Sequence, residues 1–362
     1  MNRLLSAGLL LTALLLLRMT SAAEPPLRLL RLPPIPDREG FAGGFAGVSG
    51  DRLLFAGGAN FPDKKPWEGG RKIWSAAVFA LPLEAVRAAA AADGSEPAIS
   101  FQWRNIGQLA QPLGYGVSAT FGDELICVGG SREGEHSAEV LGIRFVTDQL
   151  QQRTLPPLPH PLANHSGARI GSHLYVLGGQ RDANGLAEAL VWSLHLENLE
   201  AGWQEAAAFP GRPRILAAAG AVDGQLLIAG GAALVQDAAG KLVREYLSDA
   251  WTLDPQAGWS RLPDVPFPSV AAPSPIPLFN QRPLLLGGDD GRQVGQDPAR
   301  HRGFPKHSAL LVKPQNRWQP GPIFPPAVVT APVVQTPFAA VIISGETRPG
   351  IRSPAVWGLT AD

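Results

Sequence analysis

The chain has 362 residues, with 31 basic and 31 acidic side chains, so its formal net charge is zero. That balance argues against a nucleic-acid-binding protein and against attachment to an anionic membrane by bulk charge. Hydrophobic residues make up 45% of the chain, which is too many for a disordered protein, and the 41 glycines and 35 prolines indicate a turn-rich globular fold.

The first 23 residues have the pattern of a secretory signal. Arg3 precedes the apolar run 4–17, and the small residues 20–23 lead into Glu24, so we expect cleavage after Ala23. A bilayer span takes about 20 residues, which makes this run short, but an uncleaved anchor is the alternative because Arg18 interrupts the usual path to the cleavage site. We expect residues 24–362 to form an exported, periplasmic domain without a membrane segment after cleavage. Cys127 is the single cysteine, so no internal disulfide can form, and its apolar strand favours a buried, inert thiol.

An apolar run that ends in two glycines recurs along the chain. We call each pair a mark; its first glycine is residue 57, 129, 178, 230 or 287, and a sixth copy ends in Ser344-Gly345. Successive marks lie 49–72 residues apart, which is the period of a kelch-type propeller blade.

A second pattern precedes every mark at a constant distance. This phrase, of the type Trp-Ser-Arg-Leu-Pro, ends 19–21 residues before its mark and occupies residues 29–36, 103–110, 152–159, 203–210, 259–266 and 318–325. Two unrelated patterns that keep the same phase six times predict six repeats of one structural unit.

The two ends of the chain each hold too few residues for a blade, and together they make one. We therefore expect an all-β, six-bladed kelch β-propeller, closed by an N-terminal strand at 27–32 that completes the C-terminal blade. The longest step between marks is explained by an Ala-rich helical insertion at about 83–94, between the outer strands of the first blade.

The sixth mark opens onto a polar turn that carries an acid and a base. Pro349-Gly350 suits a type II turn, which places Glu346 and Arg352 on opposite arms of one tight loop. The pair could be part of an active site, or a structural ion pair that braces the turn.

Three long loops follow marks, at 60–72, 236–248 and 289–307, and we expect them on the same rim as Glu346. They carry the cations Lys64, Lys65, Arg71, Lys72, Arg292, Arg300, His301 and Arg302. An anionic small molecule would suit such a rim, although loop cations also serve solubility alone.

Other kinds of site are disfavoured. The seven histidines form no closely spaced ligand pair, so no metal is expected. No nucleophile elbow, phosphate-binding loop or dinucleotide-binding glycine pattern is present, and no cofactor is expected.

Several segments together resemble the kelch-type sialic acid mutarotases, also called N-acetylneuraminate epimerases, and among them the cyclically permuted mutarotases. The segments are Gly40 to Ser49, Phe55 to Phe61, Tyr115 to Ser118, Pro213-Arg214, and Gly345 to Arg352. The resemblance implies an isomerase that opens and closes the ring of N-acetylneuraminate or a related sugar acid. It also implies that Glu346 is the general base and Arg352 its partner, able to hold the substrate carboxylate or to polarise the developing charge.

We take Arg214, Asn60, Tyr115 and His165 as substrate-binding candidates, although Arg214 could instead be solvated or cap a backbone. Two other functions stay open: a non-catalytic kelch module that binds a glycan or a protein at the same rim, and a relative that acts on another aldose or uronic acid. The sequence does not define the oligomeric state.

Overall fold

The structure is a computed structural model that describes residues 26–92 and 100–361. The expected signal segment and its cleavage site lie outside these residues, as does the end of the expected helical insertion. Among the described residues, no helix has both the length and the apolar character needed to cross a membrane.

Six four-stranded antiparallel sheets form the blades of a β-propeller, which confirms the predicted fold class. From the inner strand outward, the first three blades are β2 (Phe45–Ser49), β3 (Arg52–Ala56), β6 (Ala77–Pro82) and β7 (Arg104–Gln108); β8 (Val117–Phe121), β9 (Glu124–Arg132), β10 (Glu135–Val146) and β11 (Gln149–Thr154); and β12 (Ser166–Ile170), β13 (His173–Leu177), β14 (Val191–His195) and β15 (Trp203–Glu205). The other three are β16 (Ala218–Val222), β17 (Gln225–Ala229), β20 (Ala250–Asp254) and β21 (Gly258–Leu262); β22 (Leu278–Phe279), β23 (Arg282–Leu286), β24 (Ser308–Val312) and β25 (Arg317–Pro320); and β26 (Val333–Gln335), β27 (Ala340–Ile343), β30 (Val356–Ala361) and β1 (Leu27–Leu32).

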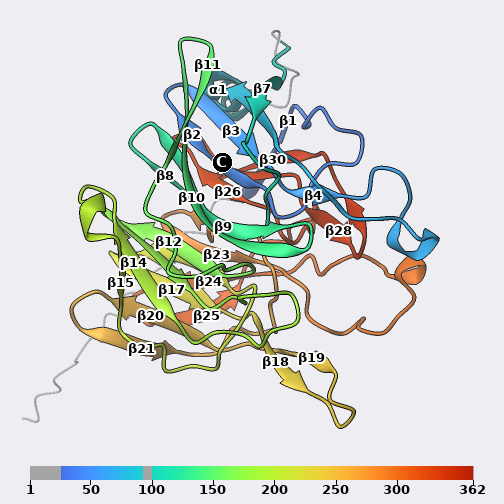
Figure 1. The fold of residues 1–362 in the computed structure, drawn as a ribbon, viewed down its shortest axis with the longest axis vertical. Helices are drawn as coiled ribbons and strands as arrows, with labels where there is room; N and C mark the ends of the chain where they lie inside the picture. Colours follow the sequence, from blue (N-terminus) through green and yellow to red (C-terminus); the bar gives the residue numbers. More distant parts are fainter. Residues whose placement is uncertain (1–25, 93–99, 362) are drawn as a thin grey trace, which may run out of the picture.

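The last blade joins the two ends of the chain. Strand β1 pairs with β30 along its whole length, from Leu27 opposite Ala361 to Leu32 opposite Val356, and Figure 1 shows blue β1 beside red β30. Leu30 and Leu32 of β1 are buried in one apolar cluster with Val341 and Val356. Burial of such side chains stabilises the fold by about 1.5–3 kcal/mol each, so this strand closes the ring by packing as well as by pairing.

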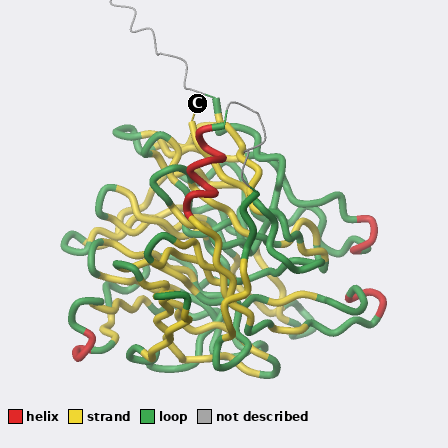
Figure 2. The backbone as a smooth tube through the Cα atoms, turned by 90° about the horizontal axis from the view of Figure 1, so that it is seen from above, coloured by secondary structure: helices red, strands yellow, loops and turns green. Residues whose placement is uncertain are grey.

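Three short hairpins follow marks and extend beyond the blades. They are β4 (Ala59–Asn60) with β5 (Ile73–Trp74), β18 (Ala232–Gln236) with β19 (Leu242–Tyr246), and β28 (Glu346–Arg348) with β29 (Ile351–Arg352). The loops that carry the one-turn helices η1 (Pro66–Glu68) and η3 (Pro298–Arg300) project from the same side of the molecule in Figure 2. The other helices are α1 (Leu83–Ala91), between β6 and β7, and η2 (Leu199–Ala201).

Both repeated sequence patterns have a physical origin in the contacts between blades. At the first position of a mark the backbone has positive φ; a Cβ on Gly57, for example, would lie 2.2 Å from the carbonyl oxygen of Leu113. The phrase supplies a side-chain donor to a carbonyl of the preceding phrase. These donors are Trp103 to Pro33 (2.8 Å), Gln152 to Gln108 (2.9 Å), Trp203 to Pro156 (2.9 Å), Trp259 to Ala207 (2.8 Å) and Trp318 to Pro263 (3.1 Å).

Candidate active site

Glu346 and Arg352 lie directly opposite each other on the hairpin β28–β29. Gly350 has φ 79°, as the second central residue of the expected turn requires, and its N–H donates to Glu346 Oε1 at 2.7 Å. The Nη1 atom of Arg352 is 3.0 Å from the same oxygen. Glu346 Oε2 accepts no hydrogen bond from any described residue, so one carboxyl oxygen is tethered and the other is free.

The Glu346 side chain is 16% exposed, and this burial is the main cause that raises the pKa of its carboxyl group. Arg352, the Gly350 N–H, Lys72 and Arg244 all oppose the rise, because each favours the ionised form. A carboxyl group whose pKa is raised toward neutrality is suited to general acid-base chemistry.

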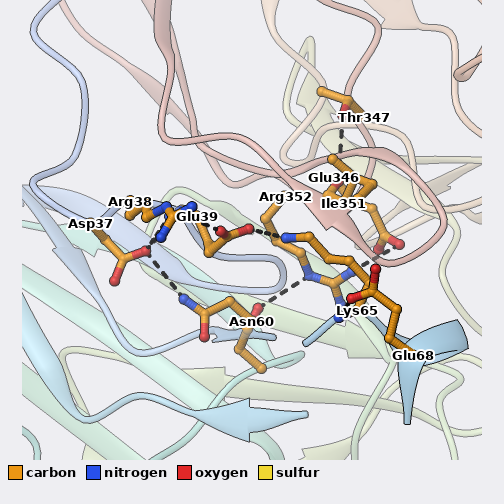
Figure 3. A network of polar contacts seen from close by, with 12 residues as sticks. Asp37, Arg38, Glu39, Asn60, Lys65, Glu68, Glu346, Thr347, Ile351 and Arg352 are labelled. Carbon is orange, nitrogen blue, oxygen red and sulfur yellow. Dashed lines mark hydrogen bonds and ion pairs between the residues drawn. The ribbon is translucent and has the colours of Figure 1, made fainter. Parts of the chain in front are cut away.

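Arg352 lies behind Glu346, and Figure 3 shows the two side chains pointing toward each other. Its side chain is 5% exposed and does not line the mouth cavity described below. Its guanidinium donates to the carbonyl of Ala59 and to the hydroxyl of Tyr115, both at 3.4 Å, and packs 4.8 Å from the ring centroid of Phe61. Arg352 therefore contacts Glu346 and Tyr115 from outside the mouth cavity, which does not favour direct contact with a substrate carboxylate, and its role as the partner of Glu346 stays a prediction.

Six residues with left-handed backbone, one from each blade, form a closed ring of hydrogen bonds around the axis. Each N–H donates to the carbonyl of the ring member in the preceding blade, over 2.7–2.9 Å, and φ lies between 51° and 67°. The members of this axial ring are Gly43, Tyr115, Asn164, Leu216, Ala271 and Thr330. Left-handed backbone costs a non-glycine residue about 1–2 kcal/mol, so the ring is a position where strain is held by the surrounding blades.

The axial ring separates two cavities. Above it lies a mouth cavity of about 530 Å³, onto which Glu346 opens, and below it lies an axial cavity of about 80 Å³. Every ring member except Gly43 lines both. The mouth cavity falls within the usual size of small-molecule sites.

The residue directly after each mark forms the next layer of the mouth. Each is bridged by backbone hydrogen bonds to the residue that precedes its axial-ring member. The six are Ala59, Ser131, Gln180, Ala232, Asp289 and Glu346, and the four polar ones line the mouth cavity. The polar half of the mouth is thus built from equivalent positions of four blades.

Three cations line the mouth cavity: Lys72, Arg132 and Arg244. Arg132 is paired with Glu135 at 2.6 Å and with Glu139 at 3.4 Å. Within the described part of the chain, Lys72 and Arg244 have no ion-pair partner, so their charges are available to an anionic ligand.

Asp289 stands at the position equivalent to Glu346 but is held differently. Its Oδ2 accepts from the hydroxyl of Tyr246 at 2.8 Å, and its Oδ1 accepts from the N–H of Gly291 at 3.0 Å. Burial and this contact with Asp289 raise the pKa of Tyr246 to about 12. Both oxygens of Asp289 are therefore occupied, in contrast to the free oxygen of Glu346.

The expected substrate-binding residues are distributed unevenly. Tyr115 lines the mouth, whereas His165 lines only the axial cavity, where burial lowers its pKa to about 3. Asn60 is buried outside the mouth and donates to Asp37 at 3.2 Å.

Arg214 is also placed away from the mouth. Its side chain is fully buried and forms a bidentate pair with Asp249 at 2.8 and 2.7 Å, and it donates to the carbonyls of Gly230 and Arg212. A guanidinium with its donors taken up in this way is structural, which corrects its expected contact with substrate.

Of the expected rim cations, Lys72 alone lines the mouth cavity. Lys65 pairs with Glu39, and Arg71 pairs with Glu133 on the next blade. Arg292 and Arg302 line a separate surface pocket with His307. The sequence reasoning did not identify Arg132, Arg244, Ser131 or Gln180, although the position after each mark is a signal that could have found the last two.

In the two described segments, no three His, Cys, Asp or Glu side chains are grouped in a way that could hold a metal ion. Cys127 is buried, and burial raises the pKa of its thiol, as expected of an inert cysteine.

The class defined by these features is a six-bladed β-propeller whose mouth contains a tethered carboxyl group and two cations that have no ion-pair partner in residues 26–92 and 100–361. No family model matches the chain. The N-acetylneuraminate epimerases of Salmonella arizonae and Salmonella typhi are each 38% identical to it over 112 residues, a match that covers 28% of this chain and 25% of each relative. The N-acetylneuraminate epimerase of Yersinia pestis (strain Pestoides F) is 37% identical over 108 residues, covering 27% of this chain and 23% of the relative.

The chain thus matches about a quarter of the length of these curated relatives. The solved structure of YjhT superimposes with a TM-score of 0.64 at 15% identity, and the match covers 89% of this chain and 95% of that one. At this identity the superposition supports the fold alone. The resemblance to N-acetylneuraminate epimerases is confirmed over part of the sequence, and the shared architecture extends over most of the chain.

Proposed function

We propose that this protein is a sugar mutarotase, an isomerase that interconverts the α and β anomers of N-acetylneuraminate or a related cyclic sugar acid. The observation that carries the proposal is the carboxyl group of Glu346, which is tethered through one oxygen while the other opens onto the mouth cavity. The names of the partial-length relatives support the same class of reaction.

Anomer exchange needs proton transfer and little else. A base takes the proton of the anomeric hydroxyl, the bond to the ring oxygen breaks, the open chain rotates, and the ring closes on the other face. Glu346 Oε2 is the base in this scheme. The reaction transfers no electrons and no group to another molecule, so the proposal requires no cofactor.

The charges of the mouth favour an acidic sugar over a neutral one. Arg244 and Lys72 have no ion-pair partner among the described residues and line the cavity with Glu346. A guanidinium binds a carboxylate through two parallel hydrogen bonds, so we assign the substrate carboxylate to Arg244.

Arg352 contributes to the proposed reaction indirectly, through its ion pair with Glu346. By lowering the carboxyl pKa that burial raises, it favours the ionised form of Glu346, which is the form that can accept a proton. It also fixes the hydroxyl of Tyr115 on the cavity wall. Its proposed role is therefore to position and tune the base.

The expected acceleration is modest. Positioned acid-base groups contribute about 10²–10⁴-fold, which suffices for a reaction that already proceeds slowly in water.

From the N-terminal sequence we also propose that the protein works in the periplasm after export.

The direct test is a panel of freshly dissolved single anomers, with equilibration followed by NMR in the presence and absence of the protein. The proposal expects faster equilibration of N-acetylneuraminate or another sugar acid, and a smaller effect on neutral aldoses. If the protein binds a sugar acid but accelerates no equilibration, the site is a binding site and the proposed function is wrong.

A further inference from the structure

Lys72 is held in an unusual place for a lysine. It precedes β5, and its Nζ lies 4.2 Å from the ring centroid of Trp74 and 4.7 Å from that of Tyr115. Both rings are fixed: the Trp74 indole donates to Ser131 at 3.2 Å, and Tyr115 belongs to the axial ring. The ammonium group is thus directed into the mouth between two aromatic faces, which attract it by cation–π interactions.

The charged and titratable groups around Lys72 come from three directions. They are Glu346 on β28, Arg352 on β29, and Tyr115, together with Arg132 and Glu135, which line the same cavity on the β9–β10 hairpin and are paired with each other. None of the described carboxylates lies within ion-pair distance of Lys72. A partly buried ammonium without a salt-bridge partner carries a desolvation cost, and such groups are often retained for chemistry.

The proposed reaction leaves one proton transfer without a donor. Glu346 removes the proton from the anomeric hydroxyl, but the ring oxygen also needs a proton as its bond to the anomeric carbon breaks. Of the two cations without ion-pair partners, Arg244 cannot serve, because a guanidinium does not deprotonate in proteins. Lys72 can both donate and accept a proton.

We propose that Lys72 is the general acid of the mouth and gives its proton to the ring oxygen of the sugar while Glu346 takes the proton of the anomeric hydroxyl. This inference rests on the proposed mutarotase function. The protons balance: after ring opening Lys72 is a neutral amine, Glu346 is a neutral carboxylic acid, and the open chain carries a carbonyl group and a new hydroxyl. On closure that hydroxyl returns its proton to Lys72 as its oxygen attacks the carbonyl carbon, and Glu346 protonates the carbonyl oxygen.

The electrostatics of the site support this role. The pKa of Lys72 is lowered to about 8, mainly by burial and also by the charge of Arg352, while Glu346 opposes the change. At neutral pH the lysine is therefore still protonated, yet it gives up its proton much more readily than an exposed lysine. The rate should fall as pH rises through about 8, because the acid form of Lys72 is then lost.

The test compares kcat and KM for anomer exchange across pH in the parent, Lys72→Arg, Lys72→Met and the control Lys64→Met. Lys64 is exposed in the same loop and does not line the mouth. We expect kcat to fall by about 10²-fold or more in both Lys72 variants, and the alkaline limb near pH 8 to disappear in Lys72→Arg, because arginine keeps its proton there. The Lys64→Met profile should match that of the parent.

The outcomes separate this inference from the proposed function. A parent protein that accelerates no anomer exchange overturns the function itself. An active parent whose alkaline limb persists in Lys72→Arg overturns the role of Lys72 alone. A Lys72→Met variant with raised KM and unchanged kcat would also overturn it, since the lysine would then be a carboxylate anchor. Circular dichroism of each variant checks that the fold is retained.

Discussion

Glu346 and Arg352 form an ion pair in which Arg352 Nη1 lies 3.0 Å from Glu346 Oε1, the same oxygen that accepts from the N–H of Gly350. The arginine is the more buried of the two and lies outside the mouth cavity. The pair is thus asymmetric: the cation and the Gly350 N–H hold one oxygen of the acid, and the other oxygen remains for a substrate. The effects expected of substitutions at Arg352 and Glu346 depend on this asymmetry.

Replacing Arg352 by Met should lower kcat about 10²-fold, because the base would no longer be held in position. Arg352 lowers the pKa of Glu346, so its removal should raise that pKa further and move the acid limb of the pH–rate profile to higher pH. The profile between pH 4 and 8 checks both effects. An acid limb that stays in place would show that Arg352 does not tune the base.

Arg244→Met should weaken the binding of acidic sugars. Loss of a charge-assisted hydrogen bond at this exposed guanidinium should raise KM about tenfold and leave kcat nearly unchanged. The substrate's methyl ester, which lacks the negative charge, should bind parent and variant equally. Arg300→Met is the matched control, because Arg300 is exposed and its one ion pair among the described residues, with Asp297, is long at 3.9 Å. Equal KM values for the acid in parent and Arg244→Met would refute the assignment.

Ser344 links the N-terminal segment to the site hairpin. It accepts from the N–H of Phe41 at 2.7 Å, and its hydroxyl lies 2.7 Å from the carbonyl of Ser353. Ser344→Ala should lower the free energy of unfolding by about 1–3 kcal/mol, because the buried Phe41 N–H loses its partner. Ser344→Gly should cost about 1 kcal/mol less, since glycine relieves the backbone strain at φ 61°. Urea unfolding of both variants measures this order. A Ser344→Ala protein that is more stable than Ser344→Gly would contradict it.

Closure of the ring by β1 can be tested at Leu30, which is 5% exposed. Leu30→Ala should lower the free energy of unfolding by about 2–5 kcal/mol, the usual cost of truncating a buried leucine. Its neighbour Arg31 is exposed on the same strand, and Arg31→Ala should cost no more than about 1 kcal/mol. Similar small losses for both variants would mean that β1 contributes little to the closed propeller.

The propeller could be predicted from the sequence because its repeat is imposed by backbone geometry. A mark needs residues that tolerate positive φ, and five of the six phrases donate a hydrogen bond to a carbonyl of the preceding phrase, so both patterns recur at nearly fixed spacing. The opposition of Glu346 and Arg352 followed from the turn at Pro349-Gly350, which is local.

The rest of the site depends on contacts between distant segments. Arg214 is neutralised by Asp249, 35 residues away, and no local pattern reveals that pairing. Arg132 and Arg244 reach the mouth only because their hairpins extend over it, and Arg352 is hidden because Tyr115 and Phe61 cover it. Which cations face the ligand is therefore a property of the packing of loops around the mouth.

The most direct test is anomer exchange by Glu346→Gln, which keeps the shape of the side chain and removes its ability to accept a proton. Glu133→Gln is the control, because Glu133 is an exposed carboxylate of the second blade. NMR of a freshly dissolved sugar-acid anomer should show loss of the acceleration, about 10²–10⁴-fold, with the dissociation constant for the sugar little changed. A Glu346→Gln protein that equilibrates the anomers as fast as the parent would contradict the proposal that this carboxyl group is the base.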